Sequence, residues 1–365
     1  MKSPNTSLEV TAGGASSATP PNSPARAASA LAGAFWPYTP PLRALDSEAA
    51  IAAAKAAKIH DFVESLHEGY DTAVGERGFI LLSDDQAKSW RQVPSPISVT
   101  LTGVAFADEH TGYAIGHGGS VLGTTDGGES WKVLLNGNTL VESLLTDALL
   151  KDDQEAAETA RFLMDDGPDK PFLDVLLISP EHLVVVGAYG FAFESLDGGQ
   201  TWNSWMSRID NPFGLHLYSV RKQGNRILIA GEQGFVALSN NNGDSFETIE
   251  TPYEGSFFTA QLPDANQIVL AGLRGNTLVS EDNGANWKQL INPIPATITA
   301  SLIDSDGQLV FANQAGLLLR LKNSTLVPVN QKPLPPLTFI LEKSDGDVLA
   351  LSINGAISLD SGSAK

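Results

Sequence analysis

Short runs of alternating apolar and polar residues, separated by turns rich in Gly and Asp, recur along most of the chain. Residues 101–107 (LTGVAFA), 120–125 (SVLGTT) and 131–135 (WKVLL) are examples, each long enough for one strand. Alternation with a period of two is typical of a β-strand with one buried face, and Gly and Asp are typical of the turns between strands. The pattern therefore predicts an all-β fold.

These runs belong to a longer repeat. Five units read AVGERGFILLSDDQAKSW at 73–90, AIGHGGSVLGTTDGGESW at 114–131, VVGAYGFAFESLDGGQTW at 185–202, IAGEQGFVALSNNNGDSF at 229–246 and LAGLRGNTLVSEDNGANW at 270–287. Two fainter copies follow at 311–321 and 350–359. The glycine that closes each G-x-x-G element recurs at intervals of 41, 71, 44, 41, 41 and 39 residues. Seven units of this length, each with four strands, predict a seven-bladed β-propeller.

The repeat also sets the domain boundaries. We expect a disordered leader over 1–33, because this segment is rich in Ser, Thr, Pro, Gly and Ala. The propeller is expected over 34–360, followed by a tail over 361–365. The seventh unit runs out after its third strand. We therefore expect the aromatic segment 34–39 (AFWPYT) to complete the seventh blade by antiparallel pairing, which would close the ring without a free edge.

The one long interval predicts an insertion over 136–171. Apolar residues from Leu140 to Leu149 fall at helical spacing, and a second helix is expected from Glu155 to Met164. An acidic turn separates the two, and Gly167 followed by Pro168 would end the pair. The insertion is therefore expected to be a helical hairpin, which either caps the propeller or packs its apolar stripe on the flank.

The turn S-x-D-x-G-x-x-W has a structural interpretation. Asp accepts backbone N–H groups within the turn, Gly adopts a positive φ, and the aromatic residue packs between neighbouring blades. The residues expected in these roles are Trp90, Asp126, Trp131, Asp197, Trp202, Phe246, Asp282 and Trp287. We therefore do not treat the three aspartates as catalytic.

Composition and charge narrow the choice of function. The chain has 23 basic and 42 acidic residues, a net charge of −19 and a pI near 4.6, so nucleic acid is not an expected partner. The absence of Cys excludes thiolate metal sites and cysteine nucleophiles. We expect no cofactor or metal, because the six His are scattered and DSDG (304–307) and SDGD (344–347) fit hairpin turns. We also expect no transmembrane span and a monomer.

The repeat AVGxxGxIxxSxDGGxTW resembles the photosystem II stability/assembly factor family of β-propellers, which carry Asp-box (bacterial neuraminidase) repeats. The similarity covers roughly 60–360, and AVGERGFILLSDD and GPDKPFLDV (167–175) look like the proteobacterial branch, often found beside export systems. The resemblance implies a seven-bladed, non-catalytic scaffold that binds a protein of a membrane or envelope complex. In photosynthetic members that partner is a reaction-centre subunit. The resemblance favours a location in the periplasm or envelope, although no signal peptide is evident in the sequence.

A ring of turn residues forms the candidate partner site. In a propeller, the turns between the second and third strands of all blades emerge on one face. Turns alone favour Asn, Asp and Gly, whereas Arg and Tyr are enriched at interface hot spots. The candidate residues are Arg77, His117, Tyr189, Gln233, Arg274 and Gln314. The alternative is an ordinary polar rim with no ligand.

A sialidase-like glycoside hydrolase is the competing hypothesis, since the Asp-box occurs in sialidases too. Such an enzyme needs three arginines that converge on a carboxylate, a Tyr nucleophile with a Glu, and an Asp acid/base. The arginines considered are Arg43, Arg77, Arg91, Arg221, Arg226 and Arg274. Tyr189 is a conceivable nucleophile, but spacing identifies no companion Glu. We therefore favour the non-enzymatic interpretation.

Overall fold

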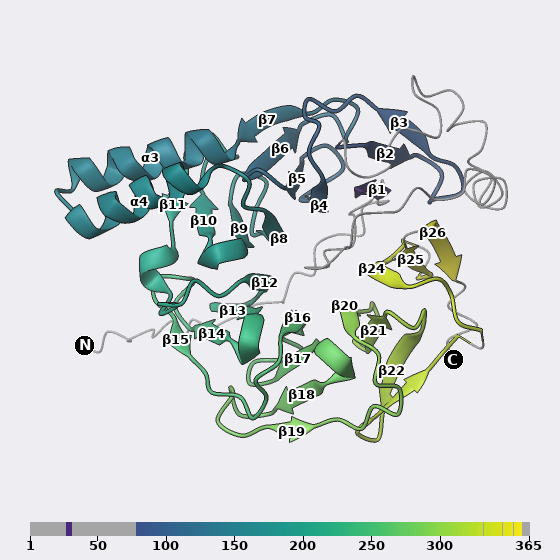
Figure 1. Cartoon of the computed structure of the whole chain (residues 1–365). Coiled ribbons are helices and arrows are strands. Elements are labelled where there is room, and N and C mark those ends of the chain that lie inside the picture. Colours follow the sequence, from purple (N-terminus) through teal and green to yellow (C-terminus); the bar gives the residue numbers. More distant parts are fainter. Residues whose placement is uncertain (1–26, 31–77, 331, 345, 353, 360–365) are drawn as a thin grey trace, which may run out of the picture.

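The computed structural model describes residues 27–30, 78–330, 332–344, 346–352 and 354–359, which form seven antiparallel sheets arranged around a common axis (Figure 1). Each sheet is one blade, so the prediction of a seven-bladed all-β propeller is confirmed. Within each complete blade the strands follow one another in chain order, from the innermost to the outermost. This order places the turns between the second and third strands, and the linkers between blades, at the same end of the ring.

Five blades have four strands. Blade 2 contains β4 (Leu101–Phe106), β5 (Gly112–Gly116), β6 (Ser120–Thr124) and β7 (Lys132–Leu135), and blade 3 contains β8 (Phe172–Leu177), β9 (Leu183–Gly187), β10 (Ala192–Ser195) and β11 (Asn203–Ser204). Blade 4 contains β12 (Leu217–Gln223), β13 (Arg226–Gly231), β14 (Val236–Ser239) and β15 (Glu247–Thr248). Blade 5 contains β16 (Phe257–Gln261), β17 (Ile268–Gly272), β18 (Thr277–Ser280) and β19 (Lys288–Gln289). Blade 6 contains β20 (Ile298–Ile303), β21 (Leu309–Asn313), β22 (Leu318–Lys322) and β23 (Thr325–Pro328).

The first and last blades have three described strands each. Blade 7 consists of β24 (Leu337–Glu342), β25 (Val348–Ser352) and β26 (Gly355–Leu359). Blade 1 consists of β1 (Ala27–Ala30), β2 (Ile80–Ser83) and β3 (Arg91–Val93), with β1 antiparallel to β2. Residues 27–30 were expected in the disordered leader, so the structure differs there. The segment 34–39, expected to complete blade 7, lies outside the described residues.

The hydrophobic core is divided among the interfaces between blades. Trp131 of blade 2, for example, lies in a buried cluster with Ile80 and Leu82 of blade 1. The aromatic residues that follow the Asp-box turns of blades 3, 4 and 5 likewise pack on the preceding blade; they are Trp202, Phe246 and Trp287. Side chains from two sheets therefore interdigitate at each of these junctions, and the aromatic residue fills the outer part.

The six described innermost strands of blades 2–7 share one irregularity. Each carries a β-bulge near its start, at Thr102, Leu173, Tyr218, Phe258, Thr299 and Thr338. The bulged residue is half-buried, whereas the residue before it is buried. A bulge redirects a side chain out of the regular alternation. Each of these blades therefore presents one extra side chain near the start of its innermost strand.

The insertion is a helical hairpin, as predicted. Helix α3 (Gly137–Leu150) begins with a capping box, in which the Asn136 side chain accepts from the Thr139 backbone N–H. Helix α4 (Gln154–Asp166) ends at Gly167, whose φ is 92°. Leu140, Val141 and Leu163 pack into the core between blades 2 and 3, while the rest of the hairpin projects outward from the ring (Figure 1). Neither of these helices is long and apolar enough to span a membrane, and no other helix in the described residues is.

Candidate functional site

The face that carries the turns between the second and third strands is here called the mouth. In blades 3, 4 and 5 these turns are the 3-10 segments Ala188–Gly190, Glu232–Gly234 and Leu273–Gly275. Their central residues, Tyr189, Gln233 and Arg274, have φ values of 57°, 52° and 57°. A left-handed backbone costs a non-glycine residue roughly 1–2 kcal/mol, which glycine avoids. Blade 2 places Gly118 at this position (φ 65°), so the backbone shape alone does not require a large side chain.

Tyr189 lies among residues from two linkers. Its ring centroid is 5.2 Å from that of His216, and its backbone N–H donates to His216 Nδ1 over 3.3 Å. The Lys170 ammonium lies 5.3 Å from the centre of the same ring, a cation–π distance. Half of the Tyr189 surface remains exposed, at 50%. The ring is therefore held on one side and open to solvent on the other.

Aromatic contacts continue from Tyr189 along the inner strands. The ring centroids of His216 and Tyr218 are 6.2 Å apart, and those of Tyr218 and Phe258 are 5.0 Å apart. Tyr218 and Phe258 are bulged residues of β12 and β16, so the bulges bring their rings together. We call Tyr189, His216, Tyr218 and Phe258 the aromatic arc. It joins blades 3, 4 and 5 at the mouth.

Burial and charge shape the polar groups of the mouth. The Lys170 side chain is only 3% exposed; its Nζ lies 2.7 Å from Asp166 Oδ2 and 3.7 Å from Asp169 Oδ1, and it donates to the Gly167 carbonyl oxygen. Burial, with a smaller effect of the Glu232 charge, raises the pKa of Tyr218 to about 12. Burial also lowers the pKa of His117, against an opposing effect of Asp169. The Tyr218 hydroxyl is therefore protonated at neutral pH, and His117 is less readily protonated than a free histidine.

The remaining described candidates lie on the mouth turns of their own blades. Arg274 borders a surface hollow of about 690 Å³, whose lining includes Tyr253 and Glu254. Gln233 and Gln314 sit on their own turns in blades 4 and 6, and the backbone N–H of Gln314 donates to Thr297 O over 2.9 Å. Arg77 lies outside the described residues. Of the six predicted residues, the structure thus places Tyr189 in a cluster of aromatic rings.

Four residues of this cluster were missed from sequence: Lys170, His216, Tyr218 and Phe258. A usable signal was present, because the aligned inner strands read HLYSV, SFFTA, TITAS and PLTFI, and their third position varies from Tyr to Phe to Thr. That position is the bulge. Lys170 and His216 precede inner strands, and only the folded path of the linkers brings them to Tyr189.

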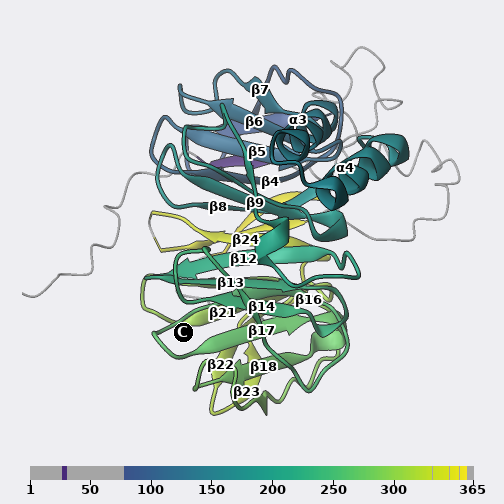
Figure 2. The ribbon, with the colours of Figure 1, turned by 90° about the vertical axis from the view of Figure 1, so that its left-hand side faces the viewer.

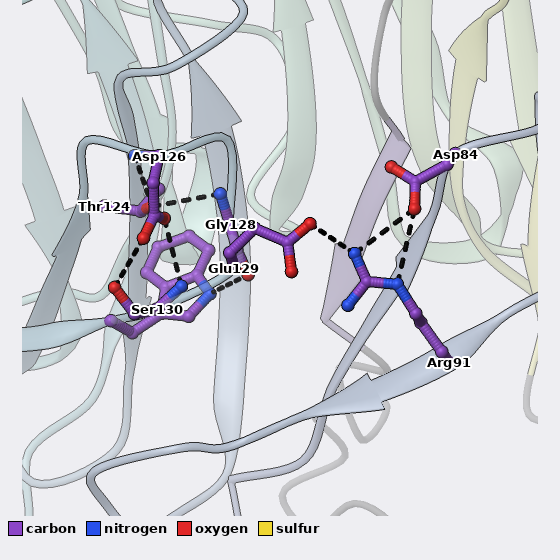
Figure 3. A network of polar contacts seen from close by, with 8 residues as sticks. Asp84, Arg91, Thr124, Asp126, Gly128, Glu129 and Ser130 are labelled. Atoms are coloured by element: carbon purple, nitrogen blue, oxygen red, sulfur yellow. Dashed lines mark hydrogen bonds and ion pairs between the residues drawn. The ribbon is translucent and has the colours of Figure 1, made fainter.

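The Asp-box residues form a separate network on the opposite face. In blade 2, Asp126 accepts from Ser130 N and Ser130 Oγ, and Thr124 Oγ1 donates to it over 2.7 Å (Figure 3). These hydrogen bonds, led by that from the Ser130 side chain, lower the pKa of Asp126 to about 2. Arg91 pairs with both Asp84 and Glu129, which links the turns of blades 1 and 2 (Figure 3). These carboxylates hold backbone and side-chain donors of the fold.

The arginines do not converge. Arg91 is on the outer strand β3, Arg221 on the inner strand β12 pairs with Asp174, and Arg226 donates to Asp264 O, at the end of the ring opposite Arg274. Arg43 and Arg77 lie outside the described residues. The described residues also contain no group of three His, Asp or Glu that could hold a metal ion. The described arginines among those considered therefore do not form a sialidase-like triad of guanidinium groups.

Seven sheets with Asp-box turns make this chain a β-propeller with bacterial neuraminidase-type repeats. The model of the photosynthesis system II assembly factor YCF48 family matches residues 82–143 and 163–254. The matched part of the chain is thus similar to the photosystem II assembly factor family, as the repeat indicated. The match is interrupted at 144–162, which lies within the helical hairpin. No match was found among curated proteins.

Solved structures show the same fold. YCF48 bound to a D1 peptide is 15% identical, with a TM-score of 0.51 over 72% of this chain and 77% of that one. The WD40 propeller of Doa1 is 12% identical, with a TM-score of 0.54 over 78% and 86%. An ancestral GH74 enzyme is 15% identical, with a TM-score of 0.50 over 72% of this chain but 37% of its own. These likenesses establish the fold, which both binding proteins and enzymes use.

Proposed function

We propose that this protein is a non-catalytic scaffold that binds a segment of a partner protein at the mouth of the propeller. The observation that carries the proposal is the half-exposed Tyr189, held in a left-handed backbone between Lys170 and His216. A strained backbone position that keeps a large aromatic side chain is typical of functional sites. Tyr is also among the residues that dominate binding energy at interfaces.

The partner is proposed to belong to a membrane or envelope complex. The family match supports an assembly role, and the related YCF48 is described as bound to a D1 peptide. The proteobacterial resemblance favours a transport-linked complex, with the protein in the periplasm or envelope as a monomer. The ring residues Arg77, His117, Gln233, Arg274 and Gln314 would then contribute polar contacts around the aromatic arc.

A capture experiment tests the proposal. The immobilised wild type is compared with the double variant Tyr189→Ser/Phe213→Ser, which removes two exposed aromatic residues at the mouth. The control is Leu196→Ser/Val133→Ser, which removes exposed apolar residues from the opposite face and an outer strand. Each is incubated with detergent-solubilised membranes of the source organism.

The proposal requires that wild type and control retain the same membrane-complex subunit and that the mouth variant loses it. Equal retention by all three would contradict it. The hydrolase alternative is tested with a fluorogenic sialoside. If the wild type hydrolyses the sialoside and Tyr189→Phe does not, the protein is an enzyme and the scaffold proposal is wrong.

A further inference from the structure

We propose that the segment bound at the mouth is cationic and apolar, and that the hairpin α3–α4 forms one wall of its binding surface. This inference rests on the proposed function, because it specifies the chemistry of the segment bound at the same site. It is carried by three observations: where the hairpin is rooted, which exposed side chains lead from it to Tyr189, and how charge is distributed over both.

The hairpin is rooted at the mouth. The Gly137 N–H, at its start, donates to Gly118 O over 2.7 Å, and Lys170 O, just after its end, accepts from Gly119 N over 2.8 Å. Gly118 and Gly119 belong to the mouth turn of blade 2. In side view the hairpin projects from the ring, with α4 at one of its faces (Figure 2).

Exposed apolar side chains continue from the hairpin to the aromatic arc. Phe162 of α4 is 68% exposed and lies one helical turn before Asp166, on the same side of the helix. Lys170 then connects α4 to Tyr189, since it pairs with Asp166 at the helix end and lies over the Tyr189 ring. On the other side of Tyr189, Gly214 approaches its carbonyl oxygen, and the adjacent Phe213 is 87% exposed. Large apolar side chains this exposed at neighbouring positions are typical of an interaction surface.

The charge of this surface is negative. The hairpin, residues 137–166, contains eight acidic and two basic residues. Negative charge is added along the mouth, between the hairpin and blade 4, by Asp169, Asp210 and Glu232. The basic residue Lys170 is buried against Asp166 and Asp169.

Such a surface attracts positive charge and repels negative charge. A second copy of this chain, with a net charge of −19, is therefore a poor occupant. A segment with Arg or Lys between apolar residues matches both features of the surface. This differs from recognition through the ring arginines Arg77 and Arg274, which would favour an acidic segment.

Fluorescence anisotropy with two short labelled peptides tests the inference. One peptide alternates Arg with Phe, and the other alternates Glu with Phe. The full-length wild type is compared with Asp169→Lys/Asp210→Lys at the mouth and with Glu109→Lys/Asp306→Lys on the opposite face, which changes the net charge equally. All four positions are exposed.

We expect the wild type to bind the Arg peptide more tightly than the Glu peptide, and added salt to weaken this binding. The mouth variant should lose about tenfold in affinity and the control variant much less. An equal loss in both variants would mean that net charge alone attracts the peptide and would overturn the inference. Preference for the Glu peptide would overturn it too, while leaving the capture experiment as a separate test of the scaffold.

Discussion

The indole of Trp90 in blade 1 packs against the buried cluster that Leu349 and Leu351 form in blade 7. This contact repeats, across the junction of the first and last blades, the way in which Trp131 packs on blade 1. The aromatic residue of the first Asp-box turn thus helps to close the ring, where each of the two terminal blades has three described strands.

We expect Trp90→Ala to open this junction. Because the Trp90 indole is half-buried, its loss should lower the free energy of unfolding by about 2–4 kcal/mol, which is towards the lower end for the deletion of an aromatic side chain. Urea denaturation measures the change. Trp287→Ala, which removes a half-buried indole from an internal junction, is the control. Loss of less than about 0.5 kcal/mol in Trp90→Ala would show that the indole does not close the ring.

The Asp-box carboxylates predict a loss of stability in acid. Hydrogen bonds lower the pKa of Asp126 from 3.8 to about 2 in the folded chain, so its carboxylate stabilises the fold above pH 3.8. That contribution is lost as the pH falls through about 2. Asp85 has the same shift, to about 2. Thermal unfolding between pH 5 and pH 2 should therefore show a steep decrease in Tm.

Blade 4 supplies the control for this pH dependence. Asn241 occupies the Asp-box position there, accepts from Ser245 N over 3.1 Å and donates to Ser245 Oγ over 2.9 Å. Asp126→Asn should therefore keep the turn at neutral pH and make Tm less dependent on pH, whereas Asp126→Ala should lower Tm at neutral pH. An unchanged pH profile in Asp126→Asn would be evidence against the carboxylate as its source.

Tyr189→Gly separates stability from binding. Glycine relieves roughly 1–2 kcal/mol at this left-handed position, but it adds entropy to the unfolded chain and loses the Lys170 and His216 contacts. These terms nearly cancel, so we expect the free energy of unfolding to change by less than about 1 kcal/mol while partner capture is lost. A decrease above about 2 kcal/mol would mean that Tyr189 serves the fold.

The outer half of the hairpin should be dispensable for folding. Leu140, Val141 and Leu163 pack on the propeller, whereas Ala148, Ala157 and Ala160 are farther along the two helices. Replacing residues 145–161 by a short glycine-containing turn should therefore lower Tm by only a few degrees, as measured by circular dichroism, and weaken binding of the Arg peptide. Loss of cooperative unfolding would contradict this division of roles.

Much of the fold could be predicted because local rules repeat. Each unit carries its own strand alternation and turn chemistry, so the repeat predicts blades without any long-range information, and the hairpin follows from helical spacing. The pairing of β1 with β2 could not be predicted in this way, because residues 27–30 and 80–83 are joined by long-range contact only.

Less of the candidate site could be predicted from the sequence, because it too depends on long-range contacts. Tyr189 was found because an aromatic residue is unusual at the centre of a G-x-x-G turn. His216 and Lys170 reach it through linkers whose paths depend on packing against the mouth turns. Tyr218 and Phe258 meet only because a bulge shifts each of them out of strict alternation, and a two-residue period does not reveal a bulge.

The central claim is that the partner binds at Tyr189. A photo-crosslinking amino acid placed at position 189 of the full-length protein, and in a separate sample at the exposed Glu247 of the outer strand β15, tests it in living cells. We predict that position 189 crosslinks to a subunit of a membrane or envelope complex and that position 247 does not. Crosslinking of that subunit from position 247 alone, or no crosslink from position 189, would contradict the account.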